Sequence, residues 1–170
     1  ASKTAKPSPQ RASQMGMLPI IPGDALRKIM GGMVESGRTL GYHSRNLMNS
    51  LIHRESGGNP EARSPKGAVG LKQLMPSSFP TYTEEELREP QRNIDLGGGY
   101  FKSLLKRYKG DTEKAIAAYN WGPKRVDIVS KNYGEDWLKY TPKGVRRFVR
   151  DVSEGASDSS IPDYYKRYGR

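Results

Sequence analysis

Cysteine is absent from the 170-residue chain. Its absence excludes a disulfide-stabilised scaffold, a zinc or iron–sulfur site with cysteine ligands, and a cysteine nucleophile. Long apolar runs are absent as well. No window comes near the roughly 18 uninterrupted apolar residues that a membrane-spanning helix needs, so the sequence predicts no such helix. The first residues are basic but carry no apolar core of about 7–15 residues, so we expect no secretory signal in this chain.

Acidic residues are scarce relative to basic ones: 18 Asp and Glu stand against 29 Lys and Arg, a formal net charge of +11. Mean hydropathy is −0.80, and the length suits one globular domain with tails. The charge predicts attraction to polyanions, namely nucleic acid, anionic lipid or anionic cell-wall polymers, without choosing among them. A basic surface that only aids solubility explains the charge equally well, and we expect no specific nucleic-acid partner.

Histidine is scarce too, with only His43 and His53, ten residues apart. Without cysteine, this spacing does not form a metal-ligand pair, so we expect no metal and no cofactor. The serine-nucleophile motif G-x-S-x-G and the phosphate-loop motif G-x-x-x-x-G-K-[ST] are both absent.

Helical periodicity is the main pattern that the sequence does contain. It predicts helices after Asp24, after a cap at Ser44, and over about residues 71–79, 94–108, 111–121, 123–129 and 142–152, with a polar connection over 80–92. No convincing strand alternation appears, so the expected fold class is mainly α, with one helical domain over residues 24–152. Residues 1–23 are rich in Ser, Pro, Lys and Arg and predict a flexible tail, and we expect a second tail over 153–170.

Glu55 is the strongest single candidate for chemistry. Leu51 and Ile52 lie four and three residues before it, so the apolar face of the expected helix ends in a carboxyl group next to a Gly-rich loop. Burial at such an edge disfavours the charged form and raises the pKa, as a general acid near neutral pH requires. The same spacing is compatible with a glutamate that reaches solvent or pairs with Arg54 or Arg63.

Two further segments carry weaker signals. Gln73 follows a pair of glycines three residues apart and has an amide that could bind a sugar hydroxyl. Tyr119, Asn120 and Trp121 end an expected helix, where a phenol, an amide and an indole could face a cleft. A core tyrosine and a helix-capping asparagine explain that segment by themselves.

Taken together, these segments resemble the lytic transglycosylases of the soluble (SLT) type, whose catalytic domain is goose-lysozyme-like. The resemblance covers about residues 44–152. It rests on five ordered segments: LIHRESGGNP at 51–60, GAVGLKQLMP at 67–76, the helix at 90–100 with Asn93 and Gly97, AAYNWGP at 117–123, and the closing helix at 142–152.

The resemblance implies a mechanism and a set of site residues. Glu55 would be the single catalytic acid, acting on the bond between N-acetylmuramic acid and N-acetylglucosamine in peptidoglycan glycan strands and leaving a 1,6-anhydro ring. Ser56, Gln73, Tyr119 and Asn120 would line the cleft, with Tyr119 helping to position the carboxyl group. Lys72 replaces the usual Met or Phe, which would place a cation on the cleft floor. Gly144 and Phe148 replace a glutamate and a tyrosine of the family pattern.

The resemblance also implies a cellular context. Such compact domains act on the bacterial cell wall in the periplasm, carried by a phage virion or by a secretion machine. The two tails would then contact other proteins of that assembly. Two alternatives stay open: a structural component on the same fold with weak or no activity, and a muramidase that hydrolyses the glycan without forming the anhydro ring.

Overall fold

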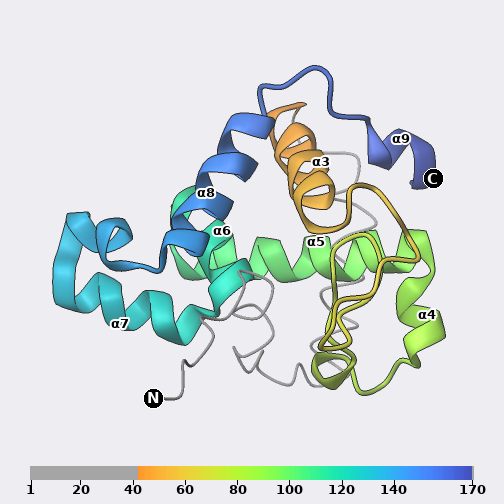
Figure 1. Ribbon diagram of the computed structural model, residues 1–170, viewed down its shortest axis with the longest axis horizontal. Helices are drawn as coiled ribbons and strands as arrows, with labels where there is room; N and C mark the ends of the chain where they lie inside the picture. Colours follow the sequence, from red (N-terminus) through yellow and green to blue (C-terminus); the bar gives the residue numbers. More distant parts are fainter. Residues whose placement is uncertain (1–41, 170) are drawn as a thin grey trace, which may run out of the picture.

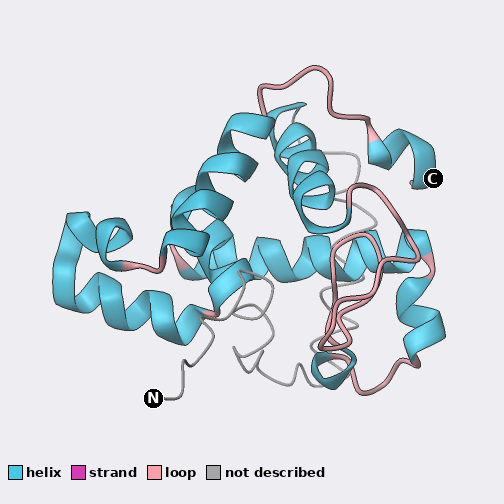
Figure 2. Cartoon of the chain, in the orientation of Figure 1, coloured by secondary structure: helices cyan, strands magenta, loops and turns pink. Residues whose placement is uncertain are grey.

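The structure is a computed structural model that describes residues 42–169, with side chains from residue 45 onward. The expected tail over 1–23 and the helix after Asp24 lie outside the described residues. The expected cap at Ser44 is wrong, because Ser44 lies within a helix that already includes Tyr42. Within residues 42–169 the only β contacts are two isolated bridges, Arg63–Val69 and Val69–Leu74. The described chain is therefore mainly helical (Figure 2), as the periodicity predicts.

The helices follow one another with short connections (Figure 1). In chain order they are α3 (Tyr42–Ser56), η1 (Pro76–Ser78), α4 (Glu84–Arg88), α5 (Pro90–Arg107), α6 (Thr112–Trp121), α7 (Pro123–Tyr133), η2 (Gly134–Tyr140), α8 (Lys143–Gly155) and α9 (Tyr164–Tyr168), where η denotes a 3-10 helix. Helix α5 crosses the middle of the molecule, and α3 packs against both α8 and α9.

The main apolar core lies where α3, α5, α6 and α8 meet. Leu51, Phe101, Ile116 and Phe148 contribute to it, and each is at most 2% exposed. Helix α8 shows why the sequence folds this way: its apolar residues recur every three or four positions and share one face. Burial of such side chains contributes roughly 1.5–3 kcal/mol each, which makes the core the rigid base of the molecule.

Local signals set several helix boundaries as predicted. The side chain of Asp111 accepts a hydrogen bond from the backbone nitrogen of Lys114 at 3.0 Å and so caps α6. Pro123 is the first residue of α7, where its missing N–H has no cost. These two boundaries are confirmed because each depends on residues close in sequence.

The expected helix over 71–79 is wrong. Only η1 forms there, and the preceding residues make a tight loop in which Gly70 and Gln73 have positive φ angles of 78° and 53°. The expected polar connection over 80–92 is also wrong in part, because it contains α4 and the start of α5. Thr83 and Glu86 form a capping box that begins α4, and Pro90 begins α5.

The C-terminal residues differ from the expected tail. Helix α8 continues to Gly155, and α9 packs against the domain with Tyr164 only 1% exposed. Tyr164 lies in an apolar cluster with Ile52, Leu71 and Ile94. Residues 153–169 therefore belong to the folded unit, because aromatic side chains hold them in place.

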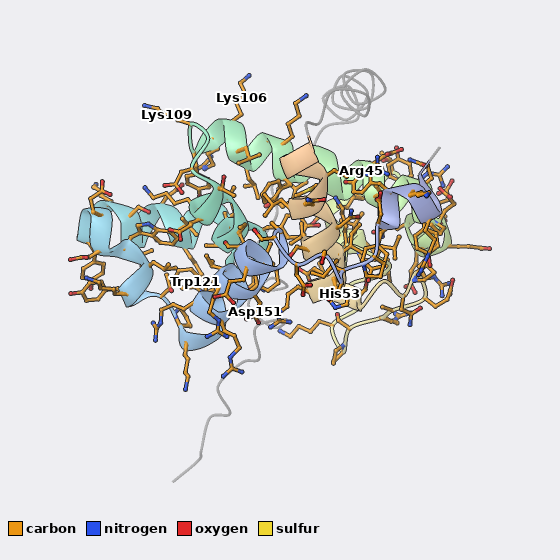
Figure 3. The ribbon with its side chains drawn as sticks, turned by 90° about the horizontal axis from the view of Figure 1, so that it is seen from above. Arg45, His53, Lys106, Lys109, Trp121 and Asp151 are labelled. Carbon is orange, nitrogen blue, oxygen red and sulfur yellow. The ribbon has the colours of Figure 1, made fainter. Side chains whose placement is uncertain are left out.

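The basic clusters of the sequence lie on the surface. Lys106 and Lys109 extend outward at the end of α5 (Figure 3), and Arg146, Arg147 and Arg150 are exposed on α8. Within the described part of the chain, no helix is long and apolar enough to cross a membrane.

Candidate active site

Glu55 lies at the C-terminal end of α3, on the face that packs into the molecule. Leu51 and Ile52 beneath it are fully buried, and Glu55 itself is only 8% exposed. Burial raises the pKa of the Glu55 carboxyl to about 8, although the positive charge of Arg54 acts in the opposite direction. Glu55 is therefore mostly protonated at neutral pH.

The two arginines that could have paired with Glu55 have other partners. The Nε atom of Arg54 lies 3.2 Å from a carboxylate oxygen of Asp151 on α8. Arg63 forms an ion pair with Glu84 at the start of α4. Burial is therefore the main influence on the pKa of Glu55, as its position at the edge of the apolar helix face predicts.

Ser56 ends the helix that carries Glu55. Its hydroxyl donates a hydrogen bond to the carbonyl of Ile52 at 3.1 Å and accepts one from the nitrogen of Gly58 at 3.2 Å. Gly57 and Gly58 follow with φ angles of 64° and 81°, which a glycine adopts without strain. The chain therefore turns away directly after Glu55. Ser56 acts in this turn, and its expected contact with substrate stays a prediction.

Gln73 stabilises the loop of residues 69–74, which is called the Lys72 loop. Its side-chain nitrogen donates hydrogen bonds to the carbonyls of Gly70 at 2.9 Å and Ala62 at 3.2 Å. Val69 and Leu74 exchange two backbone hydrogen bonds of 2.9 Å across the same loop. The amide nitrogen of Gln73 is thus engaged within the loop, and its expected role in binding a sugar stays a prediction.

Lys72 does not lie on the floor of a cleft, and this expectation is wrong. Its side chain is fully buried, with Nζ donating to the hydroxyl of Tyr165 at 3.0 Å and to the sulfur of Met48 at 3.4 Å. Burial lowers the pKa of Lys72 to about 7, partly offset by the nearby charge of Asp95. The substitution by lysine therefore changes the interior beneath the loop and presents no cation to the solvent.

Tyr119 links α6 to the loop and lies within electrostatic range of Glu55. Its hydroxyl donates a hydrogen bond to the backbone carbonyl of Lys72 at 3.0 Å. Burial raises the pKa of Tyr119 well above its usual value, and the charge of Glu55 adds to this rise. Tyr119 is therefore a neutral phenol whose proton is already committed to a neighbour.

Gly97 makes this arrangement of Lys72 and Tyr119 sterically feasible. A Cβ atom on Gly97 would lie 2.5 Å from Cδ of Lys72 and 3.1 Å from the hydroxyl of Tyr119. Both side chains therefore pass α5 at Gly97, where a side chain on the helix would obstruct them.

Asn120 and Phe148 are interior residues. Asn120 is 1% exposed at the end of α6, and Phe148 is 1% exposed in the main core under the guanidinium of Arg54. Trp121 is half-buried and packs against the same core. The expected substrate contact of Asn120 stays a prediction, and Phe148 is a packing residue.

Asn93, on α5, is a functional residue for the loop that the sequence motifs do not indicate. It is fully buried, and its side chain makes three hydrogen bonds. The oxygen accepts from the nitrogen of Lys72 at 2.7 Å, and the nitrogen donates to the carbonyls of Leu87 at 2.7 Å and Val69 at 3.0 Å. Asn93 thus fixes the loop on α5. Its position on the apolar face of that helix, among residues such as Ile94, is the signal that could have identified it.

Comparisons with known proteins support one family. The model of the transglycosylase SLT domain matches residues 34–139. The soluble lytic murein transglycosylase of Salmonella typhimurium is 36% identical over 93 residues, which are 49% of this chain and 14% of that protein. The transglycosylase of Enterobacteria phage PRD1 is 33% identical over 115 residues, which are 60% of this chain and 43% of that protein.

A solved structure supports the same family. The lytic transglycosylase Slt of Pseudomonas aeruginosa, determined as an inactive mutant with glutamine in place of a glutamate, matches with a TM-score of 0.64 and 26% identity. The match covers 88% of this chain and 25% of that one.

A helical fold with a buried glutamate at a helix end is typical of lysozyme-like proteins. Because the family model matches more than half of its residues, the chain belongs to the transglycosylase SLT domain family. The expected fold class is thereby confirmed. The chain spans less than half the length of the curated relatives named above.

Proposed function

We propose that the protein is a peptidoglycan lytic transglycosylase and that Glu55 is its catalytic acid. The observation that carries the proposal is the buried carboxyl group of Glu55, whose pKa is raised to about 8. A general acid must hold its proton at the working pH, and desolvation supplies this property. The inactive glutamate-to-glutamine mutant of the related Slt protein is consistent with a glutamate in this role.

The proposed reaction needs only one protein carboxyl group. Glu55 donates its proton to the oxygen between N-acetylmuramic acid and N-acetylglucosamine, and the C1–O bond breaks. The 6-hydroxyl of the muramoyl residue attacks C1, and the Glu55 carboxylate accepts the hydroxyl proton. The products are a 1,6-anhydromuramoyl end and a free N-acetylglucosamine hydroxyl, and Glu55 is protonated again.

The carboxylates of the described residues fit this scheme. Glu55 is the only Asp or Glu in the buried set of residues 45–169. Hydrolysing glycosidases of the common type use two carboxyl groups that flank the bond. A nucleophile supplied by the substrate removes the need for the second group.

Tyr119 and the loop would position the acid. The phenol is neutral, and it donates its proton to the carbonyl of Lys72, so the hydroxyl has a fixed orientation within electrostatic range of Glu55. We infer that the Tyr119 oxygen, as an acceptor, orients the protonated Glu55 carboxyl group before the first proton transfer. Ser56, Gln73 and Asn120 are the remaining candidates for contacts with the glycan.

The biological setting is part of the proposal. The phage PRD1 relative supports a virion-associated enzyme that opens the cell wall locally. The protein would then act on peptidoglycan in the periplasm during genome entry. Delivery by a secretion machine would place the same chemistry at the same wall.

The test is a digest of purified sacculi, with the released muropeptides identified by mass spectrometry. Wild type should release anhydro-muropeptides, and Glu55→Gln should release none. Glu113→Gln is the matched control, because it removes an exposed carboxylate in the first turn of α6. Reducing-end products would instead identify a hydrolase. An inactive wild type would favour a structural role.

A further inference from the structure

Helix α9 (Tyr164–Tyr168) lies beyond residues 34–139, the part of the chain that the family model matches. It packs beside α3 (Figure 1), the helix that ends in Glu55. A five-residue helix is far too short to be stable alone, so its order depends on its contacts with the domain. Its three tyrosines, Tyr164, Tyr165 and Tyr168, make these contacts.

Tyr164 fixes the last turn of α3. Its hydroxyl lies 2.8 Å from Nδ1 of His53, two residues before Glu55. Its backbone nitrogen donates to the side-chain oxygen of Asn49 at 2.9 Å. The ring lies so close to Gly58 that a Cβ atom there would clash with it. Tyr164 therefore touches the chain on both sides of Glu55.

Tyr165 fixes the loop through Lys72. Its hydroxyl accepts a hydrogen bond from the buried amine of Lys72 at 3.0 Å. The carbonyl of the same lysine accepts the hydroxyl proton of Tyr119, whose pKa responds to the charge of Glu55. Lys72 thus connects Tyr165 of α9 to Tyr119 of the candidate active site.

Two further contacts complete the attachment. The hydroxyl of Tyr168 donates to the carbonyl of Gly58 at 3.4 Å. Asp163, which caps α9, forms an ion pair with Arg45 of α3 at 2.7 Å. The helix is therefore attached to α3, to the turn after Glu55 and to the loop that holds Tyr119.

We propose that α9 is a positioning element of the candidate active site, which holds the end of α3 and the Lys72 loop in fixed relation through Tyr164 and Tyr165. The proposal rests on the proposed function for its catalytic consequence. Its structural part stands on the contacts alone. No α9 residue touches the reacting atoms in this account, because each acts through His53, Gly58 or Lys72.

The central variant is Tyr165→Phe, which keeps the ring and removes the oxygen that accepts from the Lys72 amine. The buried amine would then keep only the weak sulfur acceptor of Met48, which is unfavourable, so the loop should shift or open. Small displacements of catalytic groups lower the rate steeply, and we expect kcat to fall about tenfold with KM within about twofold of wild type. Tyr140→Phe is the control, since it removes the hydroxyl of an exposed tyrosine on η2.

A double-mutant cycle separates positioning from space filling. Lys72→Met removes the amine and leaves the Tyr165 hydroxyl without its donor, so it should also lower kcat. The double variant Lys72→Met/Tyr165→Phe leaves neither group unpaired and should recover most of the activity. Losses that simply add in the double variant would overturn the proposal.

Hydrogen–deuterium exchange supplies a readout that does not depend on activity. At a temperature where every variant is folded, Tyr165→Phe should raise exchange at residues 69–74, and Tyr164→Phe should raise it at residues 53–58. Helix α7 should be unchanged in both. Wild-type exchange and wild-type kcat in both variants would overturn the proposal. If wild type itself releases no muropeptides, the proposed function fails, and the exchange data still decide whether α9 holds the two segments.

Discussion

Replacing Glu55 with glutamine should stabilise the protein, and the gain should grow with pH. The folded-state pKa of Glu55 is about 8, against 4.5 for a free side chain. A carboxyl with a raised pKa contributes its stability below pH 4.5 and loses it as the pH rises through 8. Glutamine has a similar shape and never ionises, so it escapes this loss.

The magnitude follows from the difference between the two pKa values. Linkage gives a stability advantage for Glu55→Gln of about 3 kcal/mol at pH 7 and on the order of 5 kcal/mol at pH 9. At pH 4 the two proteins should differ little. Other titrating groups, including Lys72, affect both proteins alike and cancel in the comparison.

Urea unfolding of both proteins at a series of pH values and constant ionic strength measures this difference directly. The exposed control Glu113→Gln should stay within about 0.5 kcal/mol of wild type throughout. Parallel curves for wild type and Glu55→Gln would show that Glu55 ionises as an ordinary surface carboxylate and that its burial does not raise its pKa.

Three more predictions concern the support of the site. Tyr119→Phe removes the donor to the buried Lys72 carbonyl and should lower kcat about tenfold, measured on soluble glycan strands, with stability reduced by about 1–3 kcal/mol. Asn93→Ala removes three buried hydrogen bonds and should lower the unfolding free energy by about 2–4 kcal/mol in urea titrations. For Lys72, the lowered pKa of about 7 means that wild type gains stability as the pH rises from 7 to 10.5. Lys72→Met should lack this gain. As the pH falls from 10.5 to 7, the unfolding free energy of wild type should therefore decrease relative to that of Lys72→Met, as urea titrations at a series of pH values would measure.

Helix boundaries set by neighbouring residues could be predicted from the sequence. Asp111 caps α6 and Pro123 begins α7 through groups only a few residues away, so the local sequence is sufficient to predict both helix starts. The same holds for Glu55, because its neighbours on the helix face determine its burial.

The Lys72 loop could not be predicted because distant residues determine its shape. Apolar spacing over 71–79 favours a helix, but Asn93, from α5, binds the backbone of Lys72 and Val69 instead. A lysine such as Lys72 is expected at the surface. Its burial depends on a hydrogen bond to the hydroxyl of Tyr165, which lies 93 positions later in the sequence. Helix α9 was missed for the same reason, since its order depends on contacts with α3.

The proposed mechanism requires that Glu55 is protonated at the pH of the cell wall. Carbon-13 NMR of the glutamate side-chain carboxyl groups measures this protonation, with the Glu55 signal assigned by its loss in Glu55→Gln. We expect a titration midpoint near pH 8 for this signal. A midpoint near 4.5 would contradict it, because the carboxyl group would then be ionised when the glycan needs a proton.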